Sequence, residues 1–139
     1  MYILKTKSCF DSAHFLKGYE GKCSNIHGHR WKVEVEIAGD ALKKEGSTRD
    51  MLFDFSDLKE SLKKYTDAMD HVFIIERGSL KETTLAALRD EGFRICETDF
   101  RPTAENFAKY FFDLMKKDGY PIRRCLVYET PENCAAYEE

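Results

Sequence analysis

Residues 27–37 read His27-Gly28-His29-Arg30-Trp31-Lys32-Val33-Glu34-Val35-Glu36-Ile37, and apolar and polar side chains alternate through most of this stretch. Successive side chains of a β-strand point to opposite faces, so this alternation is typical of a strand with one buried and one solvated face. The parity that buries Trp31 also places His27 and His29 on the buried face. The segment therefore predicts a half-buried strand over 29–37 with two inward-facing histidines at its start.

The rest of the chain supplies further strands and helices around this strand. Ser56 is expected to cap one helix, Ser79-Leu80-Lys81-Glu82 fits a capping box for the next, and Gly92 and Gly119 fit helix ends. The expected elements, in chain order, are strands over 2–10, 29–37 and 51–53, helices over 56–69 and 79–92, a strand over 93–96, a helix over 102–119 and a strand over 124–130. This order predicts an α+β fold, with helices on one face of an antiparallel sheet. The length of 139 residues suits a single domain, 1–139.

Composition excludes several classes of function. The formal net charge of -3 argues against a general nucleic-acid-binding surface, which needs a basic face. No apolar run approaches the roughly 20 residues that span a bilayer, and the N-terminal residues lack the apolar region of a signal peptide. The five cysteines include no Cys-x-x-Cys pair, which favours reduced thiols over a disulfide framework. We therefore expect a soluble cytoplasmic protein with no membrane partner.

Three of the four histidines are candidates for a metal site. Residues two apart in a strand have Cα atoms roughly 6.5–7 Å apart and face the same side, so His27 and His29 can bind one ion. His14 follows the first expected strand, and a hairpin between the two strands would bring it to the same place. An isolated His-x-His pair is more often a hydrogen-bonded surface pair, but the third histidine favours a metal. Three protein ligands with an open position are typical of catalytic zinc.

Cys23 lies four residues before His27, and three roles are open for it. A nearby divalent cation would favour its thiolate, making it a base or nucleophile. Alternatively, it could be a fourth zinc ligand, which would make the site structural, or an inert core cysteine. Spacing alone does not decide among these.

Two acidic positions complete the candidate chemistry. Asp70 and His71 end the first expected helix, where they could relay a proton to or from a thiol; a histidine that merely interacts with the helix dipole is the alternative. Glu129 shares its parity with Val127 and Cys125, so its carboxylate is expected to face inward. There it could accept from an array of N–H donors, although an exposed edge-strand glutamate is also common.

Taken in order, these segments resemble the 6-pyruvoyl-tetrahydropterin synthase superfamily. The resemblance extends from near the start to near the end of the chain, through the segments Phe10–Leu16, Cys23–His29, Asp54–Lys59, Asp70–His71, Pro102–Asn106 and Tyr128–Pro131. Each motif is weak alone, and the ordered set is specific.

The resemblance implies a role for each candidate residue. It implies zinc on His14, His27 and His29, and Cys23 as the proton-transferring base. It implies that Asp70 and His71 are its relay partners. The implied pterin-binding residues are Glu129, as anchor and relay carboxylate, with Thr103 and Glu105 near the pocket. It further implies the tunnelling fold, in which sheets of several subunits close into a barrel, commonly a hexamer of two trimers with sites between subunits.

Within the superfamily, the three residues between Cys23 and His27 resemble the 6-carboxy-tetrahydropterin synthases of queuosine biosynthesis. The implied reaction converts 7,8-dihydroneopterin triphosphate to 6-carboxy-tetrahydropterin, with release of triphosphate and acetaldehyde. The pyruvoyl-type synthase is the alternative, and a structural-zinc module or a metal-free cysteine hydrolase are competing classes. Residues 76–100 are longer than in compact family members, so they could alter the pocket edges or the subunit contacts.

Overall fold

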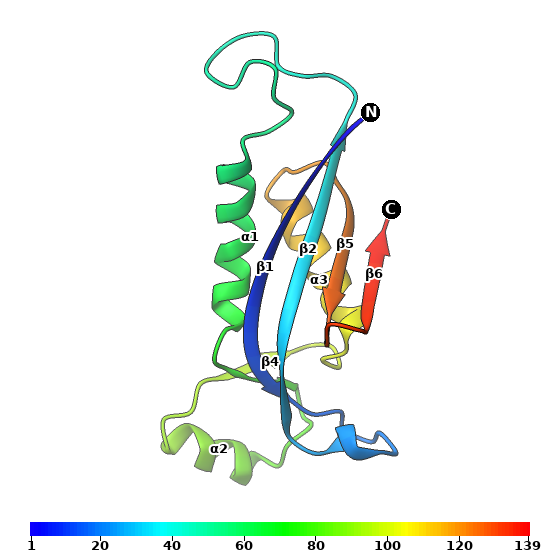
Figure 1. Ribbon diagram of the computed structural model, residues 1–139. Coiled ribbons are helices and arrows are strands. Elements are labelled where there is room, and N and C mark those ends of the chain that lie inside the picture. The colour runs from blue at the N-terminus through cyan, green and yellow to red at the C-terminus, as the bar shows by residue number, and fades with distance from the viewer.

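The computed structural model describes residues 1–139, in which three helices accompany one curled sheet (Figure 1). The six strands lie in the order β4-β3-β1-β2-β5-β6. The elements are β1 Tyr2–His14, a 3₁₀ turn Lys22–Ser24, β2 His27–Gly39, α1 Phe55–Met69, β3 Phe73–Glu76, α2 Glu82–Asp90, β4 Ile95–Thr98, α3 Ala104–Lys117, β5 Ile122–Tyr128 and β6 Cys134–Glu138.

A long antiparallel hairpin of β1 and β2 forms the centre of the sheet. Its register runs from Tyr2 opposite Gly39 to His14 opposite His27. The alternation detected over 29–37 continues beyond both ends of that range, and the first strand extends to His14 rather than ending at residue 10. The expected hairpin is confirmed, and it places His14 directly across from His27.

The C-terminal strand pair differs from the expectation. β5 ends at Tyr128, so Glu129 lies just after the strand rather than within it, and the backbone turns there with Glu129 N–H donating to Asn133 O at 3.1 Å. β6, which pairs antiparallel with β5, was not predicted from the sequence. Only Ala135 and Tyr137 of β6 pack against the core, which is too few apolar residues for a clear alternating signal.

Two short strands make the sheet mixed. β3 pairs parallel with β1, and β4 pairs parallel with β3. Parallel neighbours need a crossover connection: α2 supplies it between β3 and β4, whereas β2 and α1 lie between β1 and β3. The sheet is therefore antiparallel only through β1, β2, β5 and β6, and the β3–α2–β4 unit is added at one edge. The strand expected over 93–96 is β4, displaced by two residues.

The prediction of a strand over 51–53 was wrong. These residues belong to the loop between β2 and α1, where Met51 N–H donates to Thr48 O at 3.1 Å in a turn. β1 and β5 occupy both edges of β2, so no edge is free there to pair with a further strand. The apolar side chain of Leu52 packs beside Gly39 instead.

Helices α1 and α3 cover one face of the sheet, whereas α2 lies apart beside the edge unit (Figure 1). Phe10, Trp31, Phe107 and Phe111 are almost wholly buried between this face and α3. The opposite face, marked by Asp11, is called the open face below. None of the three helices is both long and apolar enough to cross a membrane.

The helix starts show which capping signals were correct. Thr103 caps α3 by accepting from Asn106 N at 3.3 Å, as the Pro102–Thr103 signal predicted. The N-cap of α1 is Asp54, whose Oδ1 accepts from Ser56 N at 2.7 Å, rather than Ser56 itself. The capping box at Ser79 was wrong: α2 starts at Glu82, because Glu76–Ser79 forms a turn closed by Ser79 N–H donating to Glu76 O at 3.0 Å.

The α1 cap gives a direct test of this assignment. Asp54→Ala should lower the free energy of unfolding by about 0.5–2 kcal/mol, because the N–H of Ser56 loses its acceptor. Ser56→Ala is the matched control and should change stability little. Urea unfolding of both variants measures the difference, and an equal loss in both would contradict Asp54 as the cap.

Candidate metal centre

Three imidazole rings converge where the β1–β2 hairpin opens into the loop 15–26. His14 and His27 are cross-strand partners, and His29 follows on the same face of β2. The ring centroids are 4.6 Å apart for His14 and His27, 5.1 Å for His14 and His29, and 4.9 Å for His27 and His29. Trp31 packs edge-on against His14 and His29 and forms the floor of the cluster. The strand geometry inferred from sequence thus brings all three histidines together.

Backbone carbonyls fix the orientation of two of the rings. His14 Nδ1 lies 2.8 Å from Pro102 O, and His27 Nδ1 lies 2.7 Å from Asn25 O. A carbonyl oxygen only accepts, so each Nδ1 carries the hydrogen and each neutral ring keeps a lone pair on Nε2. The two Nε2 atoms are 3.1 Å apart. Two lone pairs at this distance repel unless a cation lies beside both.

A proton does not fit the role of this cation, because burial disfavours the charged form of the imidazoles. His14 is 1% exposed, and burial lowers its pKa to about 4, with smaller contributions from His27 and His29. Burial also lowers the pKa of His29, against the opposing effect of the Glu129 carboxylate. Neutral imidazoles are the form that binds metal ions, so the cluster is electrostatically prepared for a cation other than a proton.

Glu129 supplies a fourth donor, a carboxylate oxygen, from the turn after β5. Its Oε1 lies 2.8 Å from His29 Nε2, yet that buried nitrogen has no partner in hydrogen-bond geometry. The donor atoms of His14, His27, His29 and Glu129 all lie within 4.8 Å of one another. The converging Nε2 atoms and the unsatisfied His29 nitrogen fit one metal ion, with hydrogen bonds to carbonyls supporting two ligands in the manner typical of metal-bound histidines.

Cys23 is not among the converging donor atoms. It lies in the 3₁₀ turn Lys22–Ser24, is half-buried, and its carbonyl accepts from Leu16 N at 2.9 Å. The loop that carries it joins His14 to His27, so its thiol is tied to the cluster through short stretches of chain on both sides. Its role as base stays a prediction.

Asp70 and His71 form a hydrogen-bonded pair. Asp70 Oδ2 lies 2.8 Å from His71 Nδ1, and Oδ1 accepts from Asp11 N at 2.8 Å. The Asp11 N–H and then the His71 contact hold the pKa of Asp70 below its usual range. His71 has a φ of 54°, which is unusual for a residue other than glycine, and its N–H donates to Asp11 O at 2.7 Å. Such strained backbone persists only where the surrounding contacts enforce it.

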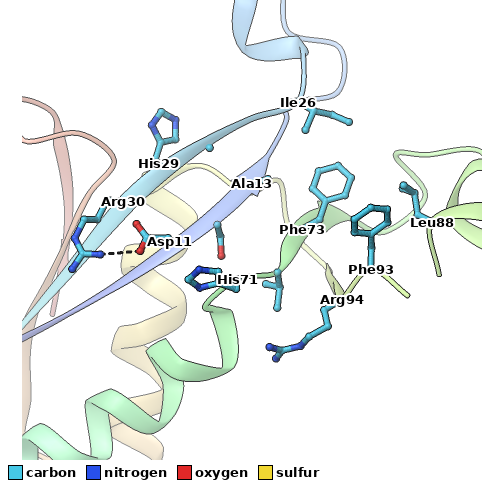
Figure 2. Close-up of a pocket in the computed structure, with 13 residues that line it drawn as sticks. Asp11, Ala13, Ile26, His29, Arg30, His71, Phe73, Leu88, Phe93 and Arg94 are labelled. Atoms are coloured by element: carbon cyan, nitrogen blue, oxygen red, sulfur yellow. Dashed lines mark hydrogen bonds and ion pairs between the residues drawn. The ribbon is translucent and has the colours of Figure 1, made fainter. Parts of the chain in front are cut away.

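The Asp70–His71 pair does not join the histidine cluster within one chain. The side chain of His71 is 76% exposed and lines a cleft of about 690 Å³ with Asp11 and Arg30, on the open face. Figure 2 shows His29 directed to the other side of β2 from Arg30 and His71. His29 also lines this cleft, but its ring points away from His71, so the two groups of candidate side chains face opposite sides of the central hairpin. The sequence predicted both groups of residues but not the opposite directions in which they point.

The segment before α3 has a clear structural role. Pro102 O orients His14, and Thr103 caps α3, while Glu105 is exposed in the first turn of that helix. The predicted roles of Thr103 and Glu105 beside a pterin remain predictions. The sequence did not predict that the carbonyls of Pro102 and Asn25 orient the rings. Every residue has a backbone carbonyl, so residue type does not indicate which carbonyls will do so.

The resemblance to known proteins covers nearly the whole chain, since a profile of 6-pyruvoyl tetrahydropterin synthase matches residues 3–139. The chain belongs to the 6-pyruvoyl tetrahydropterin synthase family. It is 39% identical to the 6-carboxy-5,6,7,8-tetrahydropterin synthase of Haemophilus influenzae over 100% of both chains. It is 32% identical to the protein of the same name from Aquifex aeolicus, over 85% of this chain and 76% of that one.

The fold of this family member is shared with solved structures. The 6-pyruvoyl tetrahydropterin synthase of Caenorhabditis elegans superposes with a TM-score of 0.68 at 23% identity, over 99% of this chain and 95% of that chain. At this identity the likeness concerns the fold alone. It confirms the tunnelling-fold architecture that the sequence resemblance implied.

Metal content is the first test of the centre. The purified chain should hold about one divalent metal ion, and His27→Ala combined with His29→Ala should remove it, because two of three imidazole ligands are lost. His71→Ala, at the one histidine outside the cluster, is the matched control. Elemental analysis measures the content, and full metal retention in the double variant would contradict the assignment.

The pKa of His14 predicts how acid affects the metal-free protein. Since its folded pKa of about 4 lies below the ordinary value of 6.5, the unfolded chain binds the proton first. Stability present above about pH 6.5 should therefore fall as the pH drops toward about 4. In urea unfolding, His14→Gln should show a shallower decline than the wild type, with His71→Gln as control. Equal declines in all three proteins would contradict a buried neutral His14.

Proposed function

We propose that this chain is a zinc-dependent 6-carboxy-5,6,7,8-tetrahydropterin synthase. It acts on 7,8-dihydroneopterin triphosphate and water, and yields 6-carboxy-tetrahydropterin, acetaldehyde and triphosphate for queuosine biosynthesis. The observation that carries the proposal is the cluster of three Nε2 atoms and one carboxylate, within a chain similar along its full length to proteins of this name. The predicted cytoplasmic location belongs to the same proposal.

Zinc suits the donor set better than magnesium or calcium does. Imidazole nitrogens favour zinc, copper, iron and nickel, whereas magnesium and calcium prefer oxygen-rich sites. His14, His27 and His29 would hold the ion, and the carboxylate of Glu129, whose Oε1 lies 2.8 Å from His29 Nε2, would remain for the substrate. When bound, zinc lowers the pKa of a hydroxyl group that it contacts.

Each remaining candidate residue has a role in this proposal. The Cys23 thiol would take a proton from the substrate side chain and return one to the ring, and His71, oriented by Asp70, would exchange that proton. Glu129 lines a second cavity of about 440 Å³ with Tyr128 and Thr130. Its carboxylate would accept from the ring N–H and amino groups of the pterin, a charge-assisted contact.

The placement of His71 supports an assembled site. Because His71 lies on the open face, away from the metal cluster of its own chain, it would serve the cluster of a neighbouring copy. β4 and β6 end the sheet with unpaired edges, and such edges are ready to pair with another chain. We therefore propose a homo-oligomer with sites between subunits, a hexamer being the form expected from the family resemblance.

The reaction product is the test of the proposal. Incubation with 7,8-dihydroneopterin triphosphate should release acetaldehyde in step with triphosphate, and elemental analysis of the active protein should find zinc. Cys23→Ala should keep the metal and lose about 10²- to 10⁴-fold in turnover, as expected when a general base is removed. Cys134→Ala, at an exposed cysteine of β6 that lines neither cavity, is the control.

Other outcomes lead to different conclusions. Triphosphate release without acetaldehyde would identify a pyruvoyl-type synthase. Loss of metal and fold in Cys23→Ala would instead indicate a structural zinc site that includes this thiol.

A further inference from the structure

The cleft beside His71 has two chemically different sides. In Figure 2, Arg30, His71 and Arg94 lie toward one side, whereas Phe73, Leu88 and Phe93 gather at the other. Leu88, Phe93 and Arg94 come from the β3–α2–β4 unit, within residues 76–100. This unit therefore adds both a cation and an apolar wall to the cleft.

Of the basic side chains Arg30, His71 and Arg94, two have a carboxylate partner and the third has none. Arg30 Nη1 lies 2.8 Å from Asp11 Oδ2, and His71 Nδ1 lies 2.8 Å from Asp70 Oδ2. The guanidinium of Arg94 has neither a carboxylate partner nor a hydrogen bond, although other basic residues of the same unit are paired: Arg77 contacts Asp99 at 2.9 Å and Arg89 contacts Glu97 at 2.7 Å. Arg94 is thus the one cation of the cleft that is free to meet an external anion.

The backbone holds Arg94 in a fixed place. Its carbonyl accepts from Phe73 N at 2.9 Å, and the preceding Phe93 N–H donates to Leu88 O at 3.1 Å. Phe73 and Ile95 are the first paired residues of β3 and β4, so His71 and Arg94 both lie in the segments that lead into these two strands. Apolar walls lower the local dielectric, which strengthens the attraction of an anion to the unpaired charge.

We propose that Arg94 binds the triphosphate of the substrate at this cleft, with Arg30 as a secondary contact. The inference rests on the proposed function, because it requires the substrate side chain to reach His71. The triphosphate is attached to the same short side chain on which His71 is proposed to act, so its phosphates lie within a few bonds of the reacting carbons. A guanidinium presents paired N–H donors that match phosphate oxygens, and it keeps its charge at every physiological pH.

Binding of inorganic tripolyphosphate tests the anion site directly. By calorimetry on the metal-loaded protein at low ionic strength, Arg94→Ala should weaken tripolyphosphate binding roughly 10- to 100-fold, the effect expected for loss of a charge-assisted contact. Arg94→Lys should recover part of the affinity. Arg89→Ala removes an arginine of α2 that lies outside the cleft, and it should bind like the wild type. If Arg89→Ala weakened tripolyphosphate binding equally, the loss would be due to the change in net charge alone, and the proposal would be overturned.

Turnover separates this proposal from the proposed function. Arg94→Ala should raise the KM for 7,8-dihydroneopterin triphosphate about as much as it weakens tripolyphosphate binding, while the affinity for neopterin, which lacks phosphates, stays unchanged. Normal tripolyphosphate binding and KM in Arg94→Ala would overturn the anion site while leaving the synthase intact. If the wild type binds tripolyphosphate through Arg94 but converts no pterin, the anion site stands and the proposed function fails.

Discussion

The candidate site depends on the hydrogen bonds that fix two imidazole rings against backbone carbonyls. With Nδ1 of His14 bound to Pro102 O and Nδ1 of His27 bound to Asn25 O, both Nε2 lone pairs must face the same small space. The hairpin register sets the distance between the two strands, and Trp31 closes the space from below. The two lone pairs repel each other unless a positive charge lies between them. The donor atoms of the cluster fit a metal ion in that position.

Much of this site follows from the sequence because its geometry is local. Alternation in residues 27–37 is enough to predict which face His27 and His29 share, and hairpin pairing then brings in His14. The same kind of pattern located α1 and α3, whose buried stripes are long enough to be unambiguous. Asp70 and His71 were also recognised as a pair, and their hydrogen bond at 2.8 Å supports that pairing.

The parts that the sequence did not predict depend on contacts between distant segments. β3 and β4 have four residues each, and β6 has only two core-facing side chains, so their strand pairing is decided by neighbours that a local pattern does not reveal. The start of α2 was misplaced because the turn at Gly78 uses Ser79 for a turn hydrogen bond instead of a cap. The placement of His71 opposite the metal cluster is likewise a property of the whole sheet.

A single strand connects these two groups of residues. Asp11 accepts from His71 N–H through its carbonyl and donates to the Asp70 carboxylate through its own N–H, so the pair is attached to β1 at both points. His14 lies three residues further along the same strand, with its side chain on the opposite face. The cost of the left-handed conformation at His71, about 1–2 kcal/mol, is offset by these two bonds. The Asp70–His71 pair is therefore attached to β1 as well as to the end of α1, where Asp70 N–H donates to Asp67 O at 3.2 Å. Its position relative to the histidine cluster is thus set within each chain. In the proposed oligomer, the Asp70–His71 pair of one copy would therefore approach the histidine cluster of another as a fixed part of its own sheet.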